Sequence, residues 1–225
     1  MITISKEDYL KAVLEAESEG AHVISATLAH RLAVSPPAVT MALRRLKRDG
    51  LVAVRADGRV ELTAAGKKVA LRTMTRHHLI ERMLAEVFGM EWYRVHDEAE
   101  RLEHAVSAEF EAKLAEKLGP ERTCPHGNPV VPERSEARRR RGLCLLSEAE
   151  PGKSYQVSSM YERDSALLRF LDERGIRPGA VLQVLERNYD QTMTLVTDKH
   201  KVSVGGPAAD KVWVAPVAQA KLRKH

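Results

Sequence analysis

The sequence predicts a mainly α-helical protein with a small amount of β structure: an N-terminal winged helix-turn-helix, a helical middle region and a small C-terminal β-barrel. Three observations support this fold class. Apolar residues recur at helical spacing through most of the first half, a short β-hairpin interrupts them near Asp57, and five short β-prone runs occupy the last third. At 225 residues, 44% of them hydrophobic, the chain can bury one large core or two small ones.

Three helices are predicted before residue 50, each from a start signal. Ser5 followed by Asp8 is typical of a helix start, and Gly20 ends that helix. Ser25 can cap a short helix over residues 26–32. Ser35-Pro36 then opens a third helix that runs to Lys47, because proline is tolerated at the first helical position.

A β-hairpin follows the third helix. Residues 51–54 and 59–62 are short β-prone runs on either side of Asp57-Gly58, a dipeptide typical of tight hairpin turns. The order helix, helix, turn, helix, hairpin is that of a winged helix-turn-helix.

In such a module the helix after the turn enters the major groove of DNA. Its exposed residues would face base edges or sugars: Ser35, Pro37, Ala38, Thr40, Met41 and Arg44. Basic residues of the same helix and of the hairpin would contact phosphates: Arg45, Lys47, Arg48 and Arg59. Each arginine alone could be an ordinary solvated charge, but their clustering on one motif favours DNA binding.

The charge distribution agrees with this hypothesis. Lys and Arg exceed Asp and Glu by 36 to 31, which gives a net charge of +5 and a pI near 9.2. Between residues 31 and 76, eleven basic residues face only three acidic ones. The N-terminal third is therefore the part suited to a polyanionic partner.

Cysteine usage predicts a reducing compartment, and hydropathy predicts no membrane-spanning segment. The two cysteines, Cys124 and Cys144, make no disulfide framework. The first residues show no basic stretch followed by an apolar one, and no apolar run approaches the roughly 20 residues that span a bilayer. We expect a cytoplasmic protein without a membrane partner.

The middle region is predicted as two long helices, one from Thr63 towards Phe88 and one over residues 96–118. Histidines and glutamates recur on them at spacings that gather side chains on one helix face: His77 and Glu81, then His96, Glu100, Glu103 and His104. Imidazole and carboxylate donors without a thiolate suit manganese or iron. The alternative is that these residues only line a solvated helix face.

The C-terminal region changes pattern. Residues 133–142 are a charged, proline-flanked connector that we expect to be a flexible tether. Five short strands and one helix then predict a small closed barrel: strands 154–157, 181–185, 192–196, 201–204 and 212–214, with a helix over 165–172. Cys124 and His126 lie in a turn-rich segment before the connector, where we expect a loop thiol rather than a metal ligand.

The assembled order resembles the diphtheria toxin repressor family of metal-activated transcription regulators, over nearly the whole chain. Four segments carry the resemblance: Val34-Ser-Pro-Pro-Ala-Val-Thr40, Arg76-His-His-Leu-Ile-Glu-Arg82, Val95-His-Asp-Glu-Ala-Glu-Arg-Leu-Glu-His104 and Gly127-Asn-Pro129. The resemblance implies four regions: a winged helix at 1–72, a helical metal-binding and dimerisation domain at 73–130, a linker at 131–148, and a Src-homology-3-like barrel of the FeoA type at 149–225.

The resemblance also implies two metal sites. The ancillary site would use His77, Glu81 and His96, and the primary site Asp8, Glu100, Glu103 and His104, while Glu162 and Asp164 are weaker candidates for ligands from the barrel. The iron-sensing branch has methionine and cysteine where this chain has Asp8 and Glu100, which looks like the manganese-sensing branch. Lys11 replaces the glutamate of two-domain manganese regulators, which argues against their closely spaced binuclear site.

The function implied is a homodimeric repressor in which manganese(II) is the co-repressor and a palindromic operator of metal-transport genes is the DNA partner. Three alternatives stay open. Iron(II) could be the activating ion, the His and Glu set could belong to a metal-dependent hydrolase, or it could be a purely structural cluster in a metal-independent DNA-binding protein. No phosphate-binding loop or nucleophile motif supports the hydrolase.

Overall fold

The computed structural model describes residues 4–119, 123–198 and 200–217. The chain divides into two compact units, and each unit is built from three separate stretches of the sequence. The first unit contains Met1–Ile80, Arg101–Pro120 and Pro129–Ser135, and the second contains Glu81–Glu100, Glu121–Asn128 and Glu136–His225. No helix among the described residues is long and apolar enough to cross a membrane.

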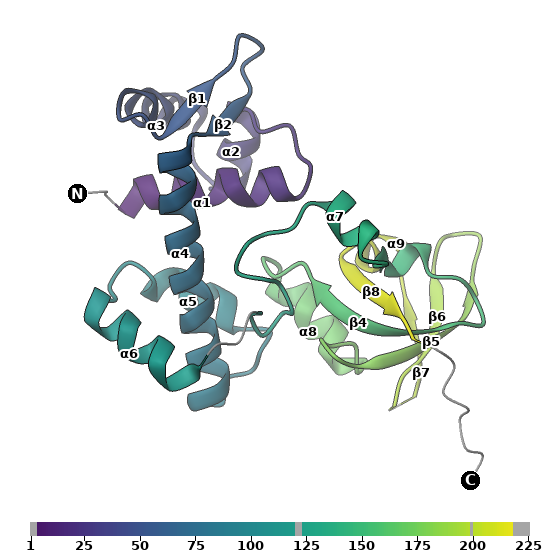
Figure 1. The fold of residues 1–225 in the computed structure, drawn as a ribbon. Coiled ribbons are helices and arrows are strands. Elements are labelled where there is room, and N and C mark those ends of the chain that lie inside the picture. The colour runs from purple at the N-terminus through teal and green to yellow at the C-terminus, as the bar shows by residue number, and fades with distance from the viewer. Residues whose placement is uncertain (1–3, 120–122, 199, 218–225) are drawn as a thin grey trace. The chain divides into compact units, whose positions relative to one another are not determined.

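The first unit begins with the predicted winged helix-turn-helix (Figure 1). Its elements are α1 (Ile4–Ser18), α2 (Ser25–Arg31), α3 (Pro36–Arg48), β1 (Val52–Val54) and β2 (Val60–Leu62). The two strands pair antiparallel, with Val52 opposite Leu62. One core receives fully buried side chains from all three helices and the hairpin: Leu10, Leu28, Val39, Leu46 and Val60.

Local signals explain the limits of α3. The Ser35 Oγ accepts a hydrogen bond from the Ala38 amide at 3.4 Å, and Pro36 is the first helical residue. At the other end, Asp49 closes the helix and Gly50 follows with φ +70°. The predicted cap, proline and stop signal are therefore confirmed.

The helical region departs from the prediction. α4 (Ala64–Arg82) continues into a π-helical turn, Met83–Val87, so the first long helix is largely confirmed. The single helix predicted over 96–118 is wrong: it is divided into α5 (Val95–Leu102) and α6 (Ala108–Leu118). Ser107 starts α6 because its Oγ accepts from the Phe110 amide at 3.2 Å, so Glu103 and His104 lie in the intervening turn.

The second unit contains the predicted barrel. Its strands are β3 (Cys144–Leu145), β4 (Ser154–Met160), β5 (Val181–Arg187), β6 (Met193–Val196), β7 (Lys201–Val204) and β8 (Val212–Pro216). They form one antiparallel sheet in the order β3-β8-β4-β5-β6-β7. The five predicted strands are present, and the two-residue β3 was missed. α8 (Ser165–Glu173) contributes the buried Leu168 and Leu171 to the core, and α9 (Gly206–Ala209) contributes Ala209.

The connector expected to be a flexible tether contains a helix, α7 (Ser135–Arg140), and a short 3-10 turn, Leu146–Glu148. Two contacts explain the order. The guanidinium groups of Arg138 and Arg139 lie 5.3 and 5.6 Å from the ring centroid of Trp213. Arg139 also forms two hydrogen bonds of 2.8 Å with Glu148.

Close packing at the start of α4 generates a stability prediction. Alanine for glycine inside a helix normally stabilises a protein by about 1 kcal/mol. At Gly66, however, a Cβ atom would lie 1.9 Å from the Leu51 carbonyl oxygen. We therefore expect Gly66→Ala to lower the free energy of unfolding by about 1–3 kcal/mol, measured by urea denaturation. Lys68→Ala, at an exposed position of the same helix, should change it by less than about 0.5 kcal/mol; equal values for the two variants would refute the packing argument.

Candidate metal centres and DNA-binding surface

The predicted DNA-facing residues of α3 are exposed. Ser35, Pro37, Ala38, Thr40, Met41, Arg44, Arg45, Lys47 and Arg48 all lie at the surface, while the buried Val39, Leu43 and Leu46 anchor the opposite face of the helix. Within the described part of the chain, Arg44, Arg45 and Lys47 form no ion pair. α3 therefore offers a basic face free to meet an anion.

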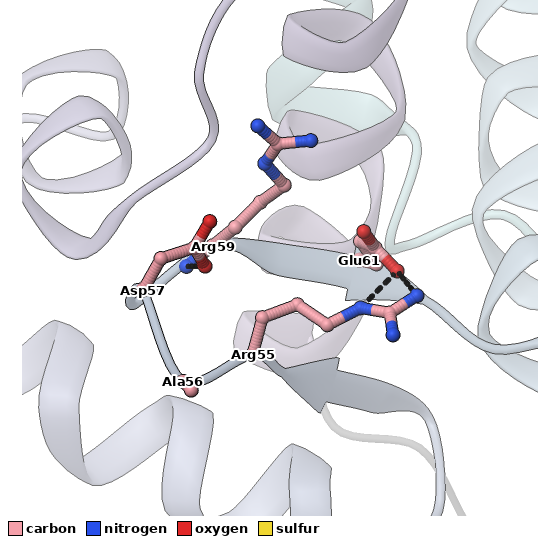
Figure 2. A pocket seen from close by; sticks show the side chains of 5 residues that line it. All are labelled: Arg55, Ala56, Asp57, Arg59 and Glu61. Carbon is pink, nitrogen blue, oxygen red and sulfur yellow. Dashed lines mark hydrogen bonds and ion pairs between the residues drawn. The ribbon is translucent and has the colours of Figure 1, made fainter.

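The hairpin turn forms a shallow pocket lined by Arg55, Ala56, Asp57, Arg59 and Glu61 (Figure 2). Figure 2 shows that its two arginines differ: Arg55 points to Glu61, with hydrogen bonds of 2.8 and 2.6 Å, whereas Arg59 points away from both. The Arg59 Nη2 lies 3.0 Å from the His22 Nε2. Arg59 is half-buried, and Arg55 has a carboxylate partner.

Three predicted ligands come together in the first unit. Asp8, Glu103 and His104 each place one donor atom within 4.8 Å of the others. The His104 Nε2 lies 2.7 Å from the Asp8 Oδ1 and 3.5 Å from the Glu103 Oε1. We call these three residues the first donor group.

The break between α5 and α6 positions this group. Asp8 projects from α1, and Glu103 and His104 occupy the turn that follows α5. Arg76 of α4 supports that turn: its Nη1 donates to the Glu103 backbone oxygen at 3.1 Å, and its Nε donates to Glu111 of α6 at 3.0 Å. The first donor group thus joins the first helix of the DNA-binding module to the helical region within one unit.

Glu103 is held by two further groups. Its Oε1 accepts from the Lys11 Nζ at 2.7 Å, and its Oε2 lies 2.6 Å from the His77 Nδ1. Glu103 is only 1% exposed and Lys11 4%. Burial raises the pKa of Glu103, but the hydrogen bond from His77 and the Lys11 charge outweigh burial, and the net pKa is below its usual value.

Asp8 shows the opposite balance. Burial raises the pKa of Asp8, and the neighbouring His104 and Lys11 only partly offset that effect. The His104 Nδ1 lies 3.1 Å from the Glu7 Oε2, while its Nε2 faces Asp8. A ring nitrogen that donates to a carboxylate leaves the other nitrogen as the electron-pair donor, which is the usual arrangement of a metal-binding histidine.

Glu100, the fourth residue expected in the primary site, is not in the first donor group. Its Oε1 lies 3.6 Å from the His96 Nε2 and 3.6 Å from the Arg163 Nη1 in the second unit. His77, expected in the ancillary site, contacts Glu103, and it precedes Glu81 by one helical turn on α4.

A second donor group lies within the second unit. Donor atoms of Glu81, Cys124 and Glu162 lie within 4.8 Å of one another. The Cys124 Sγ is 3.4 Å from the Glu162 Oε2. His126 Nδ1 is 3.5 Å from the Glu81 Oε1, 3.7 Å from the Glu162 Oε2 and 3.6 Å from the Cys124 Sγ. We call Glu81, Cys124, His126 and Glu162 the second donor group.

The orientation of His126 suits a ligand. Its Nε2 lies 2.9 Å from the Trp92 carbonyl oxygen, which can only accept a hydrogen bond. The proton therefore belongs on Nε2, and Nδ1 presents its electron pair to the second donor group.

The loop that carries His126 is tightly constrained. Gly127 adopts φ +80°, and a Cβ there would lie 2.1 Å from the Ser158 oxygen. The His126 carbonyl oxygen also accepts from the Met160 amide at 3.1 Å. The loop is thereby fixed against β4.

His96 borders the second donor group. Its Nδ1 lies 3.1 Å from the Glu81 Oε1. Burial lowers the pKa of His96, but hydrogen bonds to Glu100 and Glu81 outweigh burial and raise the pKa to about 10. In the protein without metal, His96 is thus a cation that balances the buried Glu81 carboxylate.

The structure corrects two expectations about this region. Cys124, expected to be a loop thiol and not a ligand, lies among possible donors. It is 5% exposed, and burial, then Glu162 and Glu81, raise its pKa well above the usual value. The Cys-x-His spacing of Cys124 and His126 is the sequence signal that points to this pair. Of the two acidic candidates from the barrel, Glu162 joins the donors, whereas Asp164 caps α8 by accepting from the Leu167 amide at 2.9 Å.

Both groups suit a divalent cation. Two ligands of one ion lie about 3 Å apart, because each is about 2.0–2.5 Å from the metal. The 2.7–3.5 Å contacts of the first group and the 3.4–3.7 Å contacts of the second are of that order. Buried carboxylates gathered this closely are also stabilised by a positive charge between them.

Three family models cover most of the chain. The DNA-binding domain of iron-dependent repressors matches residues 1–60, and their metal-binding and dimerisation domain matches residues 63–132. The FeoA domain matches residues 144–216.

Individual relatives agree. The iron-dependent repressor IdeR of Mycobacterium tuberculosis is 40% identical over 210 residues, covering 87% of this chain and 89% of the relative. The diphtheria toxin repressor of Corynebacterium jeikeium is 32% identical over 201 residues, covering 80% and 84%.

Among solved structures, a manganese-dependent transcriptional repressor in complex with manganese aligns with a TM-score of 0.83 at 32% identity, covering 94% of this chain and all of that one. The repressor ScaR with bound Zn²⁺ aligns with a TM-score of 0.76 at 27% identity, covering 94% and 99%. The donor groups, the exposed basic helix and these likenesses together show that the chain belongs to the diphtheria toxin repressor family: it is a metal-dependent transcriptional repressor and not an enzyme.

Proposed function

We propose that the protein is a manganese(II)-responsive repressor, and that the ion is chosen at the first donor group. The observation that carries this proposal is the composition of the group: two carboxylates and one imidazole, with no sulfur donor. Hard oxygen donors suit manganese(II), whereas thiolate and thioether donors favour softer ions. The match with a manganese-dependent repressor bound to manganese supports the same ion. Iron(II) is the competing ion, supported by the iron-dependent relatives.

Asp8, Glu103 and His104 would hold the primary ion. Glu100, predicted as a fourth ligand, contacts His96 and Arg163 instead. The bound cation would supply positive charge among these carboxylates. The Lys11 ammonium already neutralises Glu103 at 2.7 Å, so part of the negative charge is balanced before any metal binds. This supports one ion at the group rather than the closely spaced pair of two-domain manganese regulators.

The second site would use the second donor group, Glu81, Cys124, His126 and Glu162. This proposed group shares Glu81 with the ancillary set predicted from sequence, and that set of His77, Glu81 and His96 stays a prediction. Because it includes a thiolate donor, this site would discriminate less against iron(II) and zinc(II) than the first.

Metal binding would activate DNA binding by joining Asp8 of α1 to the turn after α5. α1 packs in the same core as α3, so fixing α1 restricts the recognition helix. In a homodimer this would set the separation of two α3 helices to match a palindromic operator of metal-transport genes. A coupling free energy of about 1–3 kcal/mol is typical of such a linkage.

The first prediction concerns the metal. With the full-length protein and the DNA upstream of its own gene at fixed salt, we expect weak binding with chelator and strong binding with manganese(II), measured by fluorescence anisotropy. Iron(II), zinc(II) and calcium(II) are the comparison ions. Equally strong DNA binding under chelation would contradict metal activation. Activation by iron(II) alone would show that iron(II), and not manganese(II), is the co-repressor.

The second prediction tests the primary site. His104→Ala should remove most of the metal-dependent gain in DNA affinity, about 5-fold to 150-fold, because it deletes one of the three donors. The fold should persist, because Glu103 keeps Lys11 and His77. Asp97→Ala, an exposed acidic position on α5, is the matched control and should leave the gain intact. If the metal raised the DNA affinity of His104→Ala as much as that of the wild type, His104 would not be a ligand of the primary ion.

The third prediction separates the arginines of the DNA-binding surface. Arg45→Ala should weaken binding to all DNA sequences and reduce the slope of log K against log salt by about 0.9 for a single lost phosphate contact. Arg55→Ala should change the slope much less, since its guanidinium is engaged by Glu61. Salt titrations of both variants measure this difference; identical slopes for Arg45→Ala and the wild type would exclude a phosphate contact.

A further inference from the structure

Asn128 lies at the end of the loop that carries Cys124 and His126, and it contacts a proposed ligand directly. Its Nδ2 donates to the Glu162 Oε2 at 2.6 Å and to the Met160 carbonyl oxygen at 2.9 Å. A primary amide has two N–H bonds, and both are used here. The Asn128 backbone oxygen also accepts from the Cys124 amide at 2.9 Å, which ties the loop together.

The carbonyl end of the same amide is held by α7. The Arg138 Nη2 donates to the Asn128 Oδ1 at 3.3 Å, and its Nη1 donates to the Ser159 Oγ at 2.8 Å. Since an arginine can only donate and the Met160 oxygen can only accept, the amide of Asn128 has one orientation that satisfies every contact. Arg138 therefore fixes how Asn128 faces Glu162.

The oxygen that Asn128 holds is the one that faces the other donors. The Glu162 Oε2 is the atom 3.4 Å from the Cys124 Sγ and 3.7 Å from the His126 Nδ1. A carboxylate can rotate about its last bond, and a hydrogen bond to one oxygen restricts that rotation. The contact thus determines which oxygen Glu162 presents to the second donor group.

We propose that Asn128 is a positioning residue for the second metal site: it orients the Glu162 carboxylate and is itself held by Arg138 of α7. The inference rests on the proposed assignment of Glu81, Cys124, His126 and Glu162 as ligands. It extends that assignment to a residue that contacts no metal and to the helix of the connector. Outer hydrogen-bond partners of metal ligands typically contribute about 10-fold to 100-fold in metal affinity.

The chain offers a matched pair of arginines. Arg138 and Arg139 lie at nearly the same distance from the Trp213 ring, 5.3 and 5.6 Å. Arg138 contacts Asn128, whereas Arg139 is paired with Glu148. An effect of Arg138→Ala that Arg139→Ala does not share therefore does not arise from stacking on Trp213.

The experiment is a cobalt(II) titration of the full-length, metal-free protein. Cobalt(II) bound to a thiolate gives a near-ultraviolet charge-transfer absorption, and Cys124 is the one thiol in either donor group. The band reports the second site separately from the first, which has only oxygen and nitrogen donors. Cys124→Ser should abolish the band, and Cys144→Ser should leave it unchanged. Manganese(II) competition then gives the affinity for that ion.

We expect Asn128→Ala to weaken cobalt(II) and manganese(II) binding at this site by about 10-fold to 100-fold. Arg138→Ala should cause a smaller loss in the same direction, and Arg139→Ala no loss. Thermal melting of each metal-free variant separates positioning from folding: a positioning residue lowers affinity beyond any change in Tm. If Asn128→Ala also lowers the Tm of the metal-free protein, the metal affinities of Arg138→Ala and Arg139→Ala are compared instead. A loss in Arg138→Ala alone then supports the positioning role.

Three results would overturn the inference, in whole or in part. Wild-type affinity in Asn128→Ala, with the band present, removes the positioning role and leaves the second site standing. Equal losses in the two arginine variants remove Arg138 from that role. A wild-type protein that binds cobalt(II) without a thiolate band would refute the second site itself, and the inference with it.

Discussion

The buried charge of Glu103 is the constraint around which the first unit is arranged. A carboxylate shielded from water is strongly unfavourable unless hydrogen bonds and opposite charges compensate it. Lys11 and His77 each take one of its oxygens, and Arg76 holds its backbone carbonyl. These partners come from α1 and α4, so the compensation of one charge draws together two helices that are distant in sequence. The same contacts hold the turn after α5, which places His104 against Asp8.

The two donor groups solve the same electrostatic problem differently. In the first, a lysine ammonium compensates a carboxylate while no metal is bound. In the second, burial and the carboxylates of Glu162 and Glu81 keep Cys124 in its thiol form, and a charged His96 balances Glu81. A cation that binds the Cys124 sulfur as a thiolate would release the thiol proton, so we expect its binding to depend on pH.

Much of the fold was predictable because it depends on local signals. Ser35 and Pro36 mark the start of α3, and the hairpin follows from Asp57-Gly58. The division between α5 and α6 was not predictable from periodicity, because apolar residues keep helical spacing across it and only the cap at Ser107 reveals the break.

The candidate site was predictable where helix spacing or family resemblance placed the ligands, as for Glu81 and His104. The pairing of Cys124 with Glu162, a residue that only the family resemblance suggested, was not predictable from spacing because the chain folds back between them. Cys124 and Glu162 are separated by 38 positions in sequence, and only the packing of the loop against β4 brings them together. Asp164 and Glu162 both carry a carboxylate and lie two positions apart in the sequence, yet Asp164 caps α8 while Glu162 contacts Cys124. Tertiary structure, and not residue type, decides between them.

The double proline at the start of α3 has a consequence for how this helix can meet DNA. Helix starts often capture phosphate through unbonded backbone N–H groups. Here Pro36 and Pro37 have none, the Ala38 amide donates to the Ser35 side chain, and the Val39 amide donates to the Ser35 carbonyl oxygen. The first turn of α3 is therefore closed to anions. Contacts between α3 and the DNA backbone are therefore made by cationic side chains further along the helix. Salt readily screens their attraction to phosphate.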